Sequence, residues 1–183
     1  MSPRPTDVHD GTLAGAREWY DRMIAADFER SLYPLERMTL RVWRAGQALD
    51  GVGGPVAALL RKLQRVADIA WCNAAMNSEL PSQVKPGPGL LLHHGGRSIV
   101  LHPMTRIGAN ADIYHDVTVG VRDERPPATI GDDVFLAVGV RVLGPCQVAD
   151  GTQVGANAVL VSDTDPGVTY VGIPARPVAR SRD

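Results

Sequence analysis

The histidines of this chain are its best candidates for proton transfer near neutral pH, because the pKa of an imidazole lies close to neutrality. They are His9, His93, His94, His102 and His115. His94 is followed by two glycines, and Glu79 precedes it in the segment SELP. A carboxylate beside a histidine can fix its tautomer and stabilise the imidazolium that forms. The two residues could therefore act together if the fold brings them close.

Composition excludes several classes of partner. Cys72 and Cys146 form neither a close pair nor a metal-ligand spacing, so we expect two reduced thiols and no metal site. The formal net charge of −1 gives no overall basic field, so no nucleic-acid partner is expected. The start of the chain lacks the apolar region of a signal peptide, and no apolar run reaches the ~18 residues of a membrane span. We expect a cytoplasmic protein with no membrane partner.

Apolar residues recur at helical spacing between residues 12 and 76. The three stripes are Trp19, Met23, Ile24 and Phe28; Leu32, Leu35, Leu40 and Trp43; and Leu59, Leu60, Leu63, Val66, Ile69 and Ala70. Pro34 and the glycine-rich residues 51–54 separate them. This pattern predicts roughly three helices.

A period of six residues replaces the helical period after residue 80. The recurring aliphatic residues are Leu101, Ile107, Ile113, Val119, Ile130, Leu136, Val142, Val148, Val154 and Leu160. From Val119 to Ile130 the interval is eleven, so about five residues are inserted at VRDERPP. One inward aliphatic side chain per six residues, with small residues at tight corners, fits a triangular coil of three short strands. The pattern predicts a parallel β-helix, because a sandwich of strands would show period two.

The hexads and the motif HHGGRSIVLHP resemble the hexapeptide-repeat acyltransferases, and among them the serine acetyltransferase family. The resemblance covers about residues 66–178 and includes IGANADIYHDVTVG, the stretch from DERPPATIG to GANAVL, and the ending VGIPARPV. It implies a left-handed parallel β-helix, a homotrimer with active sites between neighbouring coil stacks, and acetyl-CoA as donor. We place a helical region at 1–78, the acyltransferase domain at 79–178 and a tail at 179–183. The helical region is short, so the pairing of two trimers is left open.

The resemblance also implies roles for the residues around the glycine turn. His94 matches the catalytic histidine of the family, and Glu79 stands where the family has an acidic residue that holds this histidine. Residues one coil apart can lie above one another, so the spacing is consistent with a pair. Backbone N–H groups at Gly95 and Gly96 could face the oxyanion of a tetrahedral intermediate. The expected reaction is the transfer of an acetyl group from a thioester to a hydroxyl.

The acceptor site departs from the pattern of serine-specific members. His93 replaces an aspartate that helps to hold the substrate ammonium. In the loop, Arg125 matches the family, but Pro126 stands where a histidine is expected. His115 precedes VTVG, as a histidine does before VTIG in related saccharide O-acetyltransferases. Arg97 could face an acceptor carboxylate or a phosphate of CoA.

Small residues and cations are expected to bind the donor. The candidates for backbone contacts with CoA are Ala137, Gly139, Gly155 and Ala156, and those for its phosphates are Arg141, Arg176 and Arg180. Three functions remain open. The first is O-acetylation of serine or a serine-like small molecule, the second is O-acetylation of a saccharide or polyol, and the third is a β-helix scaffold without catalysis.

Overall fold

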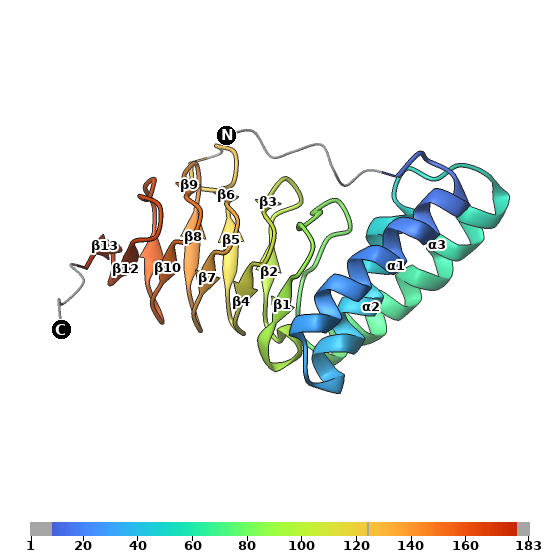
Figure 1. The fold of residues 1–183 in the computed structure, drawn as a ribbon, viewed down its shortest axis with the longest axis horizontal. Helices are drawn as coiled ribbons and strands as arrows, with labels where there is room; N and C mark the ends of the chain where they lie inside the picture. The colour runs from blue at the N-terminus through green and yellow to red at the C-terminus, as the bar shows by residue number, and fades with distance from the viewer. Residues whose placement is uncertain (1–8, 124, 179–183) are drawn as a thin grey trace.

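Three α-helices precede a stack of short strands in the computed structural model, which describes residues 9–123 and 125–178 (Figure 1). The helices are α1 (Leu13–Arg30), α2 (Pro34–Leu49) and α3 (Pro55–Asp68), and α3 continues into a π-helical segment, η1 (Ile69–Ala75). The side chain of Thr12 caps α1. Pro34 and Pro55 begin α2 and α3, where the missing N–H would have no partner within the helix. The three predicted helices are confirmed.

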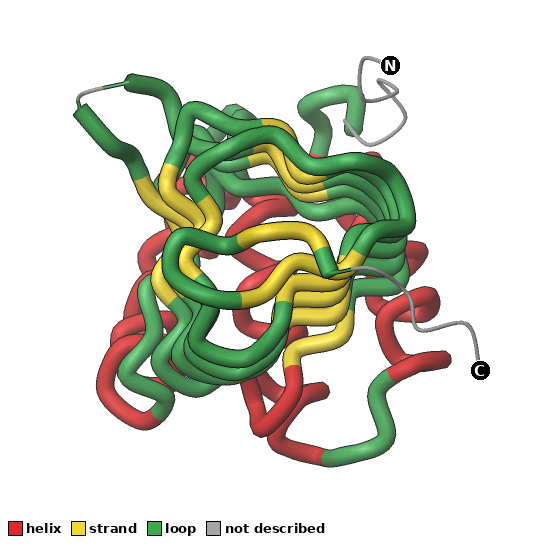
Figure 2. The backbone as a smooth tube through the Cα atoms, turned by 90° about the vertical axis from the view of Figure 1, so that its left-hand side faces the viewer, coloured by secondary structure: helices red, strands yellow, loops and turns green. Residues whose placement is uncertain are grey.

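The rest of the chain winds into a prism with three sheets as its sides (Figure 2). In spatial order, the first sheet contains β1 (Leu91–Leu92), β4 (Asp112–Ile113), β7 (Phe135–Leu136), β10 (Gln153–Val154), β12 (Thr169–Val171) and β13 (Arg176–Pro177). The second contains β11 (Val159–Leu160), β8 (Arg141–Leu143), β5 (Thr118–Gly120) and β2 (Val100–Leu101). The third contains β3 (Arg106–Ile107), β6 (Thr129–Ile130) and β9 (Gln147–Val148). The strands pair in parallel apart from the antiparallel pair of β12 with β13. The predicted β-helix is confirmed.

The register of the strands matches the six-residue period. Val100 pairs with Thr118, three hexads later along the chain. Thr118 pairs in turn with Arg141, and this second interval is longer than three hexads by the insertion predicted at VRDERPP. The ten recurring aliphatic side chains point inward and are all at most 5 % exposed. They stack from coil to coil as the core of the prism.

A buried ion pair ties the helices to the first coil. Arg44 and Asp27 lie 2.8 Å apart, and both side chains are fully buried. Arg44 also donates to the carbonyls of Pro86 at 2.7 Å and Gly87 at 2.8 Å, while Asp27 accepts the N–H of Leu90 at 2.9 Å. Every partner lies on α1, α2 or residues 86–90. The pair therefore fixes where the first coil begins.

Helix α3 packs on α2 with its small and polar side. Ala57 is fully buried and Gln64 donates to the carbonyl of Val42 at 3.2 Å. The large apolar residues of α3 and of the first position of η1 face outward and are 38–65 % exposed: Val56, Leu59, Leu60, Leu63, Val66 and Ile69. The third apolar stripe thus forms a helix, as predicted, but contributes little to the core. No helix in the described part of the chain is long and apolar enough to cross a membrane.

Candidate active site

Two columns of residues run along one edge of the prism, where the first sheet turns into the second. In successive coils Leu92 pairs with Ile113, Ile113 pairs with Leu136, and Leu136 pairs with Val154. The residues that follow these four therefore stack in the same order: His93, Tyr114, Ala137 and Gly155, and then His94, His115, Val138 and Ala156. The rings of His93 and Tyr114 are stacked with their centroids 3.9 Å apart. His94 meets His115 edge to face, with the centroids 4.7 Å apart.

His94 projects from a glycine turn, η2 (His93–Gly96), which joins β1 to β2. His94, Gly95 and Gly96 all have positive φ, at 56°, 75° and 70°. A side chain on Gly95 would place its Cβ 3.1 Å from Leu35. The turn is held from below, because Thr39 Oγ1 donates to the carbonyl of Gly95 at 2.6 Å. Glycine is therefore required by conformation and by space, and His94 itself is exposed to solvent.

His115 lies beside Asp116 and has one nitrogen without a partner. Its Nε2 is 4.0 Å from Asp116 Oδ2. Its Nδ1 is buried and makes no hydrogen bond with any residue that the structure describes. Arg141, expected at a phosphate of CoA, donates to the carbonyls of Asp116 and Gly139 and so holds this corner. The structure thus brings His115 to His94 and places Arg141 against the backbone beside His115 and Gly139.

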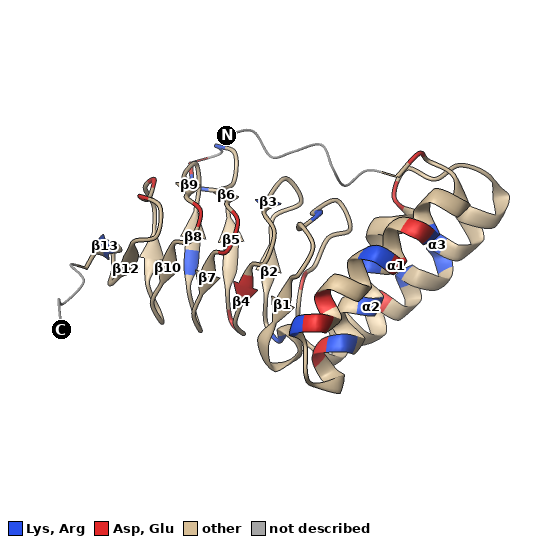
Figure 3. Ribbon diagram, in the orientation of Figure 1, with Lys and Arg blue, Asp and Glu red and all other residues tan. Residues whose placement is uncertain are grey.

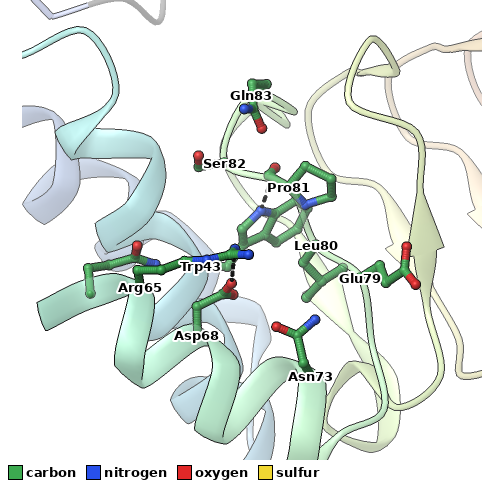
Figure 4. Close-up of a pocket in the computed structure, with 10 residues that line it drawn as sticks. Trp43, Arg65, Asp68, Asn73, Glu79, Leu80, Pro81, Ser82 and Gln83 are labelled. Carbon is green, nitrogen blue, oxygen red and sulfur yellow. Dashed lines mark hydrogen bonds and ion pairs between the residues drawn. The ribbon is translucent and has the colours of Figure 1, made fainter. Parts of the chain in front are cut away.

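Glu79 lies on the next coil below. It forms an isolated parallel bridge with Val100, and its side chain is exposed. It lines a polar pocket of about 350 Å³ between α3, η1 and residues 79–83. Its carboxylate points away from Asp68 and Trp43 (Figure 4). Among residues 9–123 and 125–178, no hydrogen bond or ion pair joins Glu79 to His94, so their pairing stays a prediction.

The remaining candidate residues are spread along the prism. Arg97 is exposed just after the glycine turn, and its carbonyl accepts the Asp116 N–H. Arg125 is exposed in the loop between β5 and β6, at a different edge of the prism from His93, His94 and His115. Arg176 is exposed and pairs with Val171, which follows Gly155 in the column that begins at His93. Arg180 and the predicted tail lie outside the described residues.

Arg30, Asp112 and Tyr114 were not identified from the sequence, although they border His93. Asp112 Oδ1 lies 3.8 Å from His93 Nε2, and Arg30 Nη2 donates to the same oxygen at 3.0 Å. The first coil, from Leu91 to its partner Asp112, is longer than three hexads because of the glycine turn. Hexad counting alone could not reveal that offset. In the part of the chain that the structure describes, no group of three or more potential ligands could hold a metal ion.

The sequence was compared with protein-family models and with curated proteins. No family model matches the chain. Over 108 residues it is 38 % identical to a serine acetyltransferase of Helicobacter pylori, and the alignment covers 57 % of this chain and 62 % of that relative. Over this stretch the chain is similar to serine acetyltransferases. A Mycobacterium tuberculosis serine acetyltransferase is 35 % identical over 88 residues, which cover 46 % of this chain and 38 % of that one. The chain thus spans less than two thirds of the length of these curated relatives.

Solved serine acetyltransferases superimpose on most of the described helices and coils. The Neisseria gonorrhoeae enzyme in complex with serine superimposes with a TM-score of 0.70 at 25 % identity, covering 91 % of this chain and 70 % of that one. A serine acetyltransferase in complex with CoA gives a TM-score of 0.71 at 20 % identity, covering 91 % and 71 %, which shows the fold alone. The resemblance predicted from the motifs is confirmed.

Proposed function

We propose that this protein is an acetyl-CoA-dependent O-acetyltransferase that acts on a hydroxyl group of a small molecule. The observation that carries the proposal is the contact between His94 and His115 at one end of the two columns of stacked residues. His94 is exposed, so its imidazole is accessible to an acceptor hydroxyl. Beyond Tyr114 and His115 the two columns continue with Ala137, Gly155, Val138 and Ala156, and we take this edge as the place of an extended donor. The relation to serine acetyltransferases supports the same chemistry.

The chemistry at this edge is a direct transfer. His94 accepts the proton of the acceptor hydroxyl while the oxygen attacks the thioester carbon. The carbonyl electron pair moves to oxygen, and N–H groups at Gly95 and Gly96 are proposed as its hydrogen-bond donors. When the intermediate collapses, the C–S bond breaks, and His94 returns the proton to the departing thiolate of CoA. Glu79 is proposed to orient His94, after rotation of its exposed side chain.

We further propose that the active unit is a homotrimer. Within one chain, Arg125 and the loop between β5 and β6 lie at a different edge from His94. A trimer would bring the loop edge of one chain beside the histidine edge of the next, so that two chains complete one site. Light scattering should then give a mass near three times 19.6 kDa. A catalytically active monomer would refute both the assembly and the shared site.

The natural acceptor can be identified by a screen. The assay is release of free thiol from acetyl-CoA in the presence of serine, homoserine, amino sugars and nucleotide sugars. A saccharide or polyol is the second candidate acceptor, favoured by His93, since an imidazole stacked on Tyr114 offers no negative charge to an ammonium group. Failure of acetyl-CoA to bind would favour the third candidate, a scaffold without catalysis. The cytoplasmic location rests on the sequence and stays a prediction.

A further inference from the structure

Three groups that can carry charge meet beside the glycine turn, on the side of α1. Arg30 ends α1 and donates through Nη2 to Asp112 Oδ1 at 3.0 Å. Its Nη1 donates to the carbonyl of Gly89 at 2.5 Å, which fixes the guanidinium between helix and coil. His93 Nε2 lies 3.8 Å from the same Asp112 oxygen. Figure 3 shows red on strand β4, which carries Asp112, and blue and red residues close together on the helices.

All three side chains remain within reach of a small molecule. The exposed fractions are 31 % for Arg30, 25 % for Asp112 and 24 % for His93. The His93 ring is held flat against Tyr114. The next residue, His94, is the proposed base, so these groups lie beside the proposed acceptor site. We refer to them as one wall of that site.

The charge on this wall is balanced. Burial lowers the pKa of His93, and the nearby charges of His94 and Arg30 act in the same direction, while Asp112 and Glu36 oppose them. His93 is therefore neutral at pH 8. Asp112 is the carboxylate closest to His93 Nε2, but Arg30 contacts it at a shorter distance. The fixed guanidinium of Arg30 therefore offsets the negative charge of Asp112 and weakens its attraction for a cationic ligand.

We propose that the ion pair of Arg30 with Asp112 determines acceptor specificity, by neutralising this wall so that the site takes a hydroxyl compound without a free ammonium group. This inference rests on the proposed function, because it concerns the acceptor of the same site. An ammonium ion loses hydration when it enters the site and regains that energy only from an available anion. The neutral imidazole of His93 and the paired carboxylate do not supply one. An uncharged saccharide, a polyol or an N-acylated amino alcohol carries no such cost.

The test compares two acceptors that differ in the ammonium group, serine and N-acetylserine, at pH 8. The wild-type protein should have the higher kcat/KM for N-acetylserine. Arg30→Met frees the Asp112 carboxylate and should raise the ratio of kcat/KM for serine over N-acetylserine by about tenfold, which corresponds to about 1.4 kcal/mol. Arg30→Met combined with Asp112→Asn should return the ratio to the wild-type value, since the freed charge is then removed.

Matched variants separate specificity from stability. Arg22→Met removes an exposed arginine from the same helix and should leave the ratio unchanged. Arg30→Lys keeps the positive charge and should also preserve it, even if the fold is weakened. Thermal unfolding of each variant shows that the protein measured is folded. A merely structural role for Arg30 would lower turnover of both acceptors equally and leave their ratio unchanged.

Binding gives the same comparison without turnover, by calorimetric titration of each acceptor into the wild type and Arg30→Met. Wild-type preference for serine, or an unchanged ratio in Arg30→Met, would overturn the inference while leaving the proposed function intact. Absence of thiol release with every acceptor would instead overturn the proposed function. In that case the binding measurement alone decides the role of Arg30 and Asp112. A shift toward serine in Arg30→Met supports it, and an unchanged preference overturns it.

Discussion

The imidazole ring of His115 lies one coil above that of His94, with the ring centroids 4.7 Å apart and the planes at 87°. This contact depends on the glycine turn. The turn lengthens the first coil, from Leu91 to Asp112, and so advances the chain before the next coil begins. Counted in regular coils of three hexads, Asp112 rather than His115 would lie above the base. The turn therefore both exposes His94 and selects its neighbour.

Glu79→Gln should lower kcat by less than His94→Ala does, because a carboxylate that orients a base acts only through it. The double variant should be no slower than His94→Ala alone, since members of one catalytic unit are not additive. Steady-state kinetics of the three variants measure this. Asp68→Asn changes another carboxylate of the same polar pocket and should leave kcat unchanged. Losses that multiply in the double variant would show that Glu79 and His94 act independently.

Ala156→Glu should weaken the binding of acetyl-CoA without unfolding the protein. Ala156 is exposed in the column above His115, and glutamate adds bulk and negative charge where a phosphate-bearing donor is expected. We expect KM for acetyl-CoA to rise at least about tenfold. The free energy of unfolding should change by no more than about 0.5 kcal/mol, as is usual for a surface position. Ala67→Glu on exposed α3 is the control, and an equal rise in KM there would contradict the placement of the donor.

His93 should make the protein less stable as the solution becomes acidic. Burial lowers the pKa of His93 in the folded chain, so the fold favours the neutral form. Its contribution is fully present above the unfolded pKa of about 6.5 and is lost as pH falls through the lower, folded pKa. Between pH 8 and pH 5, urea unfolding of the wild type should lose more stability than that of His93→Gln. If the free energy of unfolding depended on pH in the same way in both proteins, His93 would not be the cause of the loss of stability in acid.

Arg44→Met should destabilise the fold by about 3–5 kcal/mol, because it leaves the Asp27 carboxylate buried without a partner. Urea unfolding monitored by circular dichroism gives the value. Replacing both members, by Asp27→Leu with Arg44→Met, should recover part of the loss, since no unpaired charge then remains. Arg22→Met is the surface control. A loss below about 1 kcal/mol for Arg44→Met would show that the buried pair does not hold the helices on the first coil.

The sequence predicted the repeating part of the fold well, because each inward position contributes the same signal. Ile107, Ile113 and Val119 each mark one side of a coil, and the longer interval from Val119 to Ile130 indicates the inserted loop. The helices were recognised from their period, but not the orientation of α3. Leu63 lies on a clear apolar stripe and is still 60 % exposed. Periodicity shows that a face is apolar without showing what covers it.

The candidate site was predicted only where local sequence carries the signal. His94 and its glycines were found because the turn is contiguous in sequence. The contact of Arg30 with Asp112 joins residues far apart in the chain and depends on how α1 lies against the first sheet, which no local pattern encodes. Tyr114 was overlooked for a similar reason, since its stacking on His93 follows from the lengthened first coil.

The most direct test of the account is the release of thiol from acetyl-CoA by the wild type and by His94→Ala, measured with the best acceptor from the screen. General-base catalysis typically contributes about 10²–10⁴-fold to the rate. We therefore predict that kcat of His94→Ala falls by that factor, while calorimetry shows that CoA still binds. A His94→Ala protein that keeps more than half of the wild-type activity would contradict the assignment of His94 as the base, and with it the proposed mechanism.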